Sequence, residues 1–186
     1  AFLIPIIHRL IHKFGNSAEA KAVQALVLIP TRELGVQCAA VFECLAKNTK
    51  ARVVLSLGGL DRGIQERELK SKPELIVATA GRIIDHMRNF LPPKYLSKLS
   101  MLVIDEADRL LQSGFETQLM ELLTLCQHSR DGRQTALFSA TINPGIVDIG
   151  KLALKHPVKI KLQPPDRTVE SLKQQLAWID KPKHKE

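Results

Sequence analysis

Short runs of aliphatic and β-branched residues alternate with helix-length segments along most of the chain. Six runs have the length and composition of strands, namely Ala25–Ile29, Arg52–Leu57, Leu75–Thr79, Met101–Ile104, Thr135–Phe138 and Val158–Leu162. Helical patterns lie between them, at 31–46, 61–69, 81–89, 115–126 and 144–153. Strands that are apolar on both faces need a cover on each side. The alternation therefore predicts an α/β fold with a parallel sheet and helices on both faces.

The composition narrows the range of functions. A chain of 186 residues with 45% hydrophobic and 25% charged residues has the material for one globular domain. Its three cysteines have no CxxC spacing, so we expect reduced thiols in an intracellular protein, and no apolar run is long enough for a membrane helix. The net charge of +8 is compatible with binding of nucleic acid, which is a polyanion. With only six Phe, one Tyr and one Trp, we expect such a ligand to be held by its backbone rather than by base stacking.

Polar, glycine-rich or acidic segments follow each of the first five predicted strands. Ligands of a parallel sheet bind beyond the carboxyl ends of its strands, where loops meet helix N-termini. The clearest case is Asp105, which ends a buried-strand pattern and is followed by Glu106. A Mg²⁺ ion bound to phosphate oxygens would compensate a carboxylate at the edge of a core, and the second acid could orient or deprotonate a water. The alternative for this pair alone is a solvated acidic helix N-terminus.

Five segments, taken together and in order, resemble the first RecA-like domain of DEAD-box ATP-dependent RNA helicases. They are Pro-Thr-Arg-Glu-Leu at 30–34, Gly-Gly at 58–59, Thr-Ala-Gly-Arg at 79–82, Asp-Glu-Ala-Asp at 105–108 and Ser-Ala-Thr at 139–141. The resemblance covers residues 1–163 and implies a RecA-like fold of the P-loop NTPase type. Pro164 and Pro165 then predict a linker, and 164–186 resembles that linker plus the start of a second RecA-like domain.

The resemblance implies a role for individual residues. Asp105 would hold hydrated Mg²⁺, Glu106 would position the water that attacks ATP, and Asp108 would bond to Ser139 and Thr141, which link the nucleotide to unwinding. Residues that would contact the sugar-phosphate backbone of RNA are Pro30, Thr31, Arg32, Gly58, Gly59, Thr79, Gly81 and Arg82. ATP and Mg²⁺ are the implied cofactors. The implied partners are RNA and the second RecA-like domain, in a monomer.

Two departures from the family pattern affect these expectations. The family's phosphate loop, GxxxxGK[ST], and its adenine-recognising glutamine motif would precede Ala1 and are not in these 186 residues. We therefore expect the chain alone neither to bind nor to hydrolyse ATP appreciably, and saturable micromolar binding would contradict this. Ala80 stands where the family usually has Pro, which loosens the loop without changing Thr79 or Arg82.

Three classes of function remain open. The first is an ATP-driven RNA helicase; the second is a non-catalytic RNA-binding or partner-docking module that keeps the fold. The third, a two-metal nuclease built on Asp105, Glu106 and Asp108, leaves the Ser-Ala-Thr segment unexplained. Residues 81–89 and 155–160 resemble nucleolar ribosome-biogenesis members, so we expect a nuclear, nucleolar or cytoplasmic protein. The first helix is expected to turn Ile4, Ile7, Ile11 and Phe14 to the core.

Overall fold

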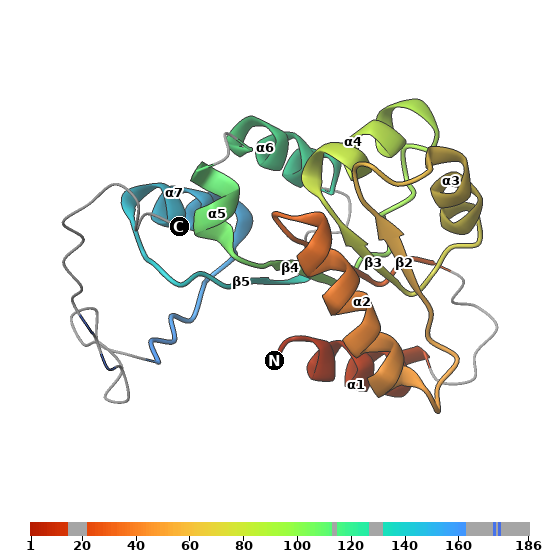
Figure 1. The fold of residues 1–186 in the computed structure, drawn as a ribbon, viewed down its shortest axis with the longest axis horizontal. Coiled ribbons are helices and arrows are strands. Elements are labelled where there is room, and N and C mark those ends of the chain that lie inside the picture. Colours follow the sequence, from red (N-terminus) through yellow and green to blue (C-terminus); the bar gives the residue numbers. More distant parts are fainter. Residues whose placement is uncertain (15–21, 113–114, 127–131, 163–172, 174, 176–186) are drawn as a thin grey trace, which may run out of the picture. The chain divides into compact units, whose positions relative to one another are not determined.

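Helices and strands alternate in the part of the chain that the structure, a computed structural model, describes: residues 1–14, 22–112, 115–126, 132–162, 173 and 175. The chain divides into two compact units, Ala1–Lys155 and His156–Glu186. All the helices and strands among the described residues belong to the first unit (Figure 1). In chain order they are α1 (Leu3–Phe14), β1 (Ala25–Leu28), α2 (Arg32–Ala46), β2 (Val53–Ser56), α3 (Arg62–Lys70), β3 (Leu75–Ala78), α4 (Ala80–Asn89), β4 (Met101–Ile104), α5 (Ala107–Gln112), α6 (Glu116–Leu125), β5 (Gln134–Leu137) and α7 (Pro144–Ala153).

The five strands form one parallel sheet in the order β2-β3-β1-β4-β5. The three inner strands β3, β1 and β4 are buried at every position, because neighbours pair with them on both sides and helices cover both faces. The edge strands β2 and β5 are only partly buried. The predicted parallel sheet is confirmed.

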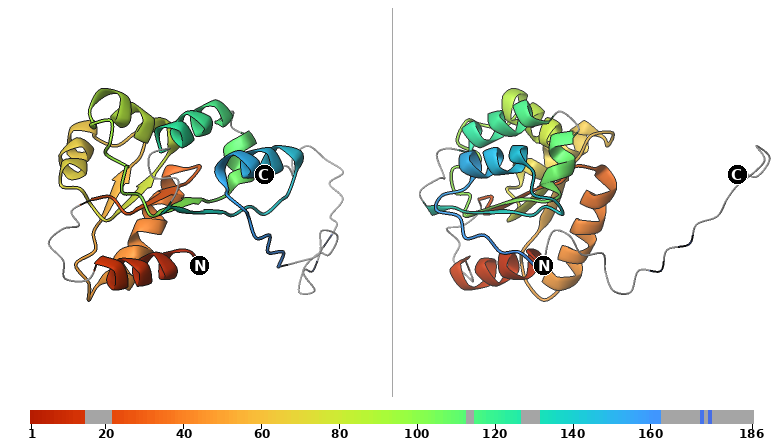
Figure 2. Two further views of the ribbon diagram at one scale, coloured as in Figure 1. Left: turned by 180° about the vertical axis from the view of Figure 1, so that it is seen from behind. Right: turned by 90° about the vertical axis from the view of Figure 1, so that its left-hand side faces the viewer.

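Two hydrophobic cores lie on opposite faces of this sheet (Figures 1 and 2). Leu26, Leu28, Leu102 and Ile104 point into one core, where they meet side chains of α3 to α7. Alternate residues of the same strands point into the other core, which α1 and α2 cover. The period-two alternation of side chains along each strand thus divides a continuous apolar run between two layers of helices.

Side chains fix where several helices begin. Thr31 Oγ1 accepts a hydrogen bond from the Leu34 amide at 3.3 Å, and Asp61 Oδ1 accepts one from Ile64 at 2.7 Å. Asn143 Oδ1 accepts one from Ile146 at 3.0 Å, and Pro144 occupies the first turn of α7. These N-caps satisfy amides that have no partner within the helix, so the loop after each strand turns directly into a helix.

The strand predicted at Val158–Leu162 is wrong. These residues are described without a strand, and Val158, Ile160 and Leu162 are exposed. Apolar residues alternate with lysines here, which satisfies the strand pattern, but a strand also requires a neighbour for its backbone hydrogen bonds. None of the five described strands provides one. The linker predicted at Pro164 and Pro165 lies outside the described residues.

The predicted core face of α1 is also wrong in part. Ile7 is buried as expected, but Ile4 and Ile11 are 64% and 47% exposed, and the buried positions are Leu3, Ile6, Ile7 and Leu10. The apolar residues of this helix form one broad face opposite the polar residues, and packing against α2 and the sheet buries only part of that face, so Ile4 and Ile11 lie at its exposed margin. The Phe14 side chain lies outside the described set. None of the helices that the structure describes has the length and apolar run needed to cross a bilayer.

Candidate functional site

The carboxyl ends of the five strands bring the predicted site residues to one edge of the sheet. In register, Leu28 pairs with Ala78 and with Ile104, Ser56 pairs with Ala78, and Ile104 pairs with Leu137. The segments at 30–34, 58–59, 79–82, 105–108 and 139–141 therefore leave the sheet at similar heights. This edge has two halves. The segments that follow β4 and β5 form an acidic half, and the segments that follow β1, β2 and β3 form a half with basic and glycine residues.

Asp105 and Glu106 occupy the turn between β4 and α5. Asp105 accepts a hydrogen bond from the Glu106 amide at 3.0 Å, and its own amide donates to Leu28 O at 2.9 Å, which fixes it beside β1. Glu106 adopts φ +48°, a left-handed conformation that costs a non-glycine residue about 1 kcal/mol or more. Arg109 Nη1 donates to Glu106 Oε2 at 3.2 Å. The turn thus presents two carboxylates with defined orientations at the end of a buried strand.

Asp108 connects this turn to the segment after β5. Its Oδ2 atom accepts hydrogen bonds from Thr141 Oγ1 at 3.0 Å and from the Thr141 amide at 3.3 Å. Ser139 Oγ donates to Thr141 O at 2.6 Å, which stabilises the bend that places Thr141 there. The structure therefore brings Asp108 together with Ser139 and Thr141, although Asp108 lies more than thirty residues before them in the sequence.

The two aspartates have opposite electrostatic environments. Burial raises the pKa of the Asp105 carboxyl above its usual value, which outweighs the hydrogen bond from the Glu106 amide. Burial also raises the pKa of Asp108, but hydrogen bonds from Thr141, from backbone amides and from Ser139 outweigh it and hold that pKa below its usual value. Asp108 is stabilised as an anion by the protein itself, whereas Asp105 would be stabilised as an anion by an added cation.

The residues present suit a cation held largely by other ligands. Among the described residues, no group of three or more His, Cys, Asp or Glu side chains could enclose a metal ion. Asp105 and Glu106 supply carboxylate oxygens alone, which is the chemistry that Mg²⁺ prefers when water and phosphate oxygens complete its shell. The donor set therefore fits Mg²⁺ that arrives with a nucleotide.

The other half of the edge converges on the loop after β2. Gly59 has φ +76°, and a Cβ atom there would lie 3.1 Å from Arg32 Nη1, so Arg32 approaches this loop closely. Arg82 Nη2, from the first turn of α4, donates to Leu60 O at 3.4 Å. Three of the predicted segments thus meet around exposed backbone, the exposed Arg32 and the partly exposed Arg82.

The remaining predicted residues lie at the first turns of α2 and α4. Pro30 lies two residues beyond the end of β1, and the Thr31 hydroxyl caps α2. The Thr79 amide donates to Ser56 O at 3.1 Å, and its side chain makes no capping bond. Gly81 faces Gln118 of α6, and a Cβ atom there would lie 3.2 Å from Gln118 Oε1. Gly58 is exposed and has no neighbour within 4 Å of its Cβ position.

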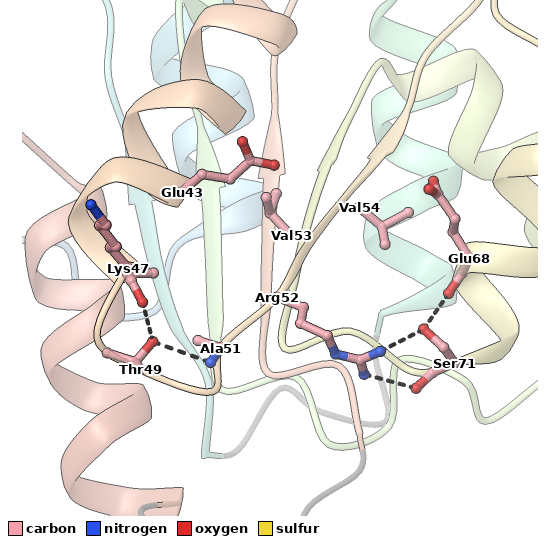
Figure 3. A pocket seen from close by; sticks show the side chains of 10 residues that line it. Glu43, Lys47, Thr49, Ala51, Arg52, Val53, Val54, Glu68 and Ser71 are labelled. Carbon is pink, nitrogen blue, oxygen red and sulfur yellow. Dashed lines mark hydrogen bonds between the residues drawn. The ribbon is translucent and has the colours of Figure 1, made fainter.

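A pocket of about 440 Å³ lies at the opposite end of β2 (Figure 3). Three of the polar side chains that line it, those of Thr49, Arg52 and Ser71, hydrogen-bond within the protein. Arg52 donates to Ser71 Oγ and Ser71 O, both at 3.0 Å, and Thr49 Oγ1 donates to Ala46 O at 2.8 Å. The pocket is remote from the carboxyl edge and is not part of the candidate site.

Sequence patterns missed two groups that support the site. Arg109 is exposed, and its spacing of three residues from Glu106 on a short helix is the only signal that could have found it. Gln65 and His86 are buried polar residues, 3% and 0% exposed, behind the Gly58–Gly59 loop. The sequence signal for both residues is a polar side chain at a helix position where the pattern predicts an apolar one.

The buried His86 gives a testable pH dependence. Burial lowers the pKa of His86 below its ordinary value of 6.5, and Arg82 and Arg62 lower it further, while Asp85 and Glu66 act in the opposite direction. Between the two pKa values the unfolded chain binds a proton that the folded chain does not. This contribution to stability is therefore complete above about pH 6.5 and is lost as the pH falls through the folded-state pKa.

We expect the free energy of unfolding of the wild type to decrease below that pH more steeply than that of His86→Leu. Urea unfolding at a series of pH values measures the difference. The exposed His8, replaced by Leu, is the control and should keep the wild-type pH dependence. Parallel curves for wild type and His86→Leu would contradict the assignment.

A parallel sheet covered on both faces, with paired carboxylates at the carboxyl end of a central strand, is an architecture that RecA-like α/β domains share. Comparison with known proteins makes this specific, because the family described as DEAD/DEAH box helicase matches residues 1–149. The chain belongs to the DEAD/DEAH box helicase family.

Individual relatives and solved structures agree with this assignment. The chain is 43% identical to the ATP-dependent RNA helicase DRS1 of Yarrowia lipolytica over 99% of its own length and 24% of that protein. It is 40% identical to the probable ATP-dependent RNA helicase DDX27 of Homo sapiens, over 96% of this chain and 22% of that one. The chain thus spans about a quarter of the length of these curated relatives.

Two solved structures share the fold. The yeast DEAD-box splicing factor Prp28 superposes with a TM-score of 0.76 at 31% identity, over 83% of this chain and 37% of Prp28. The DEAD-box helicase Mss116, solved with single-stranded RNA and UDP-BeF, superposes with a TM-score of 0.72 at 30% identity, over 82% of this chain and 32% of Mss116.

Proposed function

We propose that this chain forms the core of the ATP-binding domain of an ATP-dependent RNA helicase, which couples ATP hydrolysis to RNA unwinding or to remodelling of RNA–protein complexes. One observation carries the proposal. The sheet edge has a carboxylate half, joined by the Asp108–Thr141 hydrogen bond, beside a half where Arg32, Gly59 and Arg82 converge. A site for nucleotide chemistry and a site for a polyanion therefore share the same set of strand ends.

The acidic half supports ATP hydrolysis. Asp105 would hold Mg²⁺ through water, and Glu106 would accept a proton from, or orient, the attacking water. The ion would supply charge neutralisation for the phosphate oxygens. The left-handed turn at Glu106 and the hydrogen bond from Arg109 keep the Glu106 carboxylate in one orientation, which a base that acts on a single water requires.

The basic half supports binding of RNA through its backbone. Arg32 is exposed and Arg82 is partly exposed, so both can contact phosphates, and the exposed amides near Gly58 and Gly59 allow close approach of a phosphate oxygen. Residues 1–100 carry a net charge of +7, whereas 101–150 carry −4. Contacts of this kind hold RNA without reading its bases.

Asp108, Ser139 and Thr141 are proposed to connect the two halves. Asp108 lies three residues after Asp105, and Thr141 follows the neighbouring strand β5. A change in the turn at Asp105 that displaces Asp108 also changes the position of the segment after β5. This is how occupancy of the nucleotide site would reach the rest of the protein.

The wider setting is part of the same proposal. We place the RecA-like domain at 1–163 and propose that 164–186 form a linker and the start of a second RecA-like domain, in a monomeric protein. The relatives named DRS1 and DDX27, together with the segments at 81–89 and 155–160, support a role in ribosome biogenesis within the nucleus.

Arg82→Gln should weaken binding of single-stranded RNA. Loss of one phosphate contact is expected to lower affinity by roughly tenfold and to reduce the slope of log Kd against log salt by about 1, equally for RNAs of different sequence. Fluorescence anisotropy of a labelled RNA over a series of KCl concentrations measures both.

The control is Arg88→Gln, which makes the same charge change on the same helix. Arg88 pairs with Glu121 of α6 at 2.6 Å instead of facing the loop after β2. Equal affinities and slopes for wild type and Arg82→Gln would contradict the assignment of the basic half to RNA.

A further inference from the structure

Gln65 of α3 is a buried polar side chain that holds the loop after β2. Its Oε1 atom accepts a hydrogen bond from the Leu57 amide at 3.1 Å, and its Nε2 atom donates to Leu57 O at 3.0 Å and Leu60 O at 3.3 Å. The side chain is 3% exposed. One amide group therefore closes both ends of the segment that contains Gly58 and Gly59. A buried amide of this kind is tolerated only because all these bonds are made.

This loop has little else to define its conformation. Gly58 and Gly59 are exposed, no side chain packs at the Gly58 Cβ position, and Gly59 adopts φ +76°. Glycine has more accessible backbone conformations than any other residue, so two consecutive glycines are ordered only by contacts from outside. Among the described contacts, the hydrogen bonds from Gln65 are the buried ones that the loop makes.

His86 of α4 lies against the Gln65 amide. Its Nε2 atom lies 3.4 Å from Gln65 Oε1, and the ring is fully buried. Because Gln65 Oε1 already accepts from the Leu57 amide, it is an acceptor, and His86 must carry its proton on Nε2 to donate to it. If the Gln65 amide were flipped, its Nε2 donor would face two other donors, the Leu57 amide and His86 Nε2.

Helices α3 and α4 are joined around this contact. Arg62 donates to Glu66 at 2.8 Å and approaches Asp85 of α4 at 3.4 Å, while Glu66 lies 4.0 Å from His86 Nδ1. Arg82, also on α4, donates to the Leu60 carbonyl that Gln65 holds. The loop after β2 and the first turn of α4 are thus tied into one network behind the surface proposed for RNA.

We propose that Gln65 is a positioning residue for RNA binding, which holds Gly58, Gly59 and Leu60 in the binding conformation, and that His86 locks its amide. This proposal rests on the proposed function, because it assigns Gln65 to the same RNA site. Gln65 does not itself contact RNA. Gln65 orders the backbone that contacts RNA. Its hydrogen bond to Leu60 O also fixes the position of the carbonyl to which Arg82 donates.

The test compares Gln65→Met with Leu69→Val in the full-length protein. Met has a similar volume but makes none of the three hydrogen bonds, whereas Leu69 is a fully buried residue of the same helix that belongs to a different core from Leu57. We expect Gln65→Met to raise the RNA concentration that half-saturates ATP hydrolysis by roughly tenfold, as expected when a buried hydrogen-bond set is lost. The rate at saturating RNA and the affinity for ATP should stay at the wild-type values. Leu69→Val should leave all three unchanged while lowering the melting temperature.

Amide hydrogen exchange supplies a readout that needs no RNA. Exchange at residues 57–60 should be faster in Gln65→Met than in wild type or Leu69→Val. If the wild type has no RNA-dependent activity, the proposed function fails, and the exchange data still decide whether Gln65 orders the loop. If the wild type responds to RNA but Gln65→Met matches it in half-saturation and exchange, the positioning role is overturned. Should Gln65→Met fail to fold, Gln65→Asn, which keeps an amide that is one methylene too short to reach these partners, takes its place with the same direction of change expected.

Discussion

Replacing Glu106 by Gln should lower the rate of RNA-stimulated ATP hydrolysis by about 10²–10⁴-fold in the full-length protein, the range expected on loss of a general base. Gln has the same shape and can still accept the hydrogen bond from Arg109, which lies 3.2 Å from Glu106 Oε2. It cannot accept a proton from water. The left-handed backbone at Glu106, φ +48°, is set by the turn and should persist in the variant.

ATP and RNA affinities should therefore change little while turnover falls. The control is Glu116→Gln, which makes the same change at an exposed position on α6. Turnover, measured by phosphate release at saturating ATP and RNA, should be unaffected in the control. Wild-type turnover in Glu106→Gln would show that this carboxylate does not act on the water.

Replacing Leu102 by Ala should destabilise the domain by about 2–5 kcal/mol, as deletion of a buried leucine side chain does. Leu102 is fully buried in β4, an inner strand that pairs with β1 and β5, and it points into the core beneath α4 to α7. Parallel strands held on both sides cannot shift to fill the space without breaking hydrogen bonds, so collapse around the cavity is limited. For a domain of this size the loss corresponds to a decrease in melting temperature of roughly 5–15 °C.

Leu152→Ala is the matched control for this substitution. Leu152 lies on α7 and is 49% exposed, so the same truncation removes little buried area. Its effect should stay within about 0.5 kcal/mol. Thermal unfolding followed by circular dichroism measures both variants, and equal melting temperatures for Leu102→Ala and Leu152→Ala would contradict the placement of the core.

The sheet was predictable because its strands obey a local rule. Runs such as Met101–Ile104 are apolar at every position, which is typical of a strand covered on both faces, and helix-length connections between such runs require parallel pairing. The same rule fails at Val158–Leu162, where the alternation is present and a hydrogen-bonding neighbour is not among the described strands. The hydrophobic pattern indicates that a segment can form a strand, but the strand forms only where a neighbouring strand accepts its backbone hydrogen bonds.

Helical spacing was less informative than strand composition. In α1 it predicted Ile4 and Ile11 for the core, whereas Leu3, Ile6 and Leu10 occupy it. The apolar face of this helix is broad, and spacing alone does not indicate which part of that face packs against the sheet and α2. The predicted helices did not include α5, although an acidic helix N-terminus at Asp105 and Glu106 was one of the two interpretations of that pair.

The chemistry at the strand ends was predictable from residue type and order, but its supports were not. Asp108 and Thr141 were expected to bond, and the structure places Thr141 Oγ1 3.0 Å from Asp108 Oδ2. The link from Gln65 to the loop after β2 depends on how α3 packs beside α4, a long-range relation that neither composition nor spacing encodes. Buried polar side chains of this kind become interpretable only when their partners are seen.

ATP hydrolysis by the full-length protein, measured with and without single-stranded RNA, tests the central claim most directly. If the carboxylate half and the basic half of this sheet edge act together, hydrolysis should be slow without RNA, rise on addition of RNA and support ATP-dependent separation of an RNA duplex. Tight binding of RNA with no hydrolysis of ATP under any condition would contradict the account and would identify the chain as part of a non-catalytic RNA-binding module.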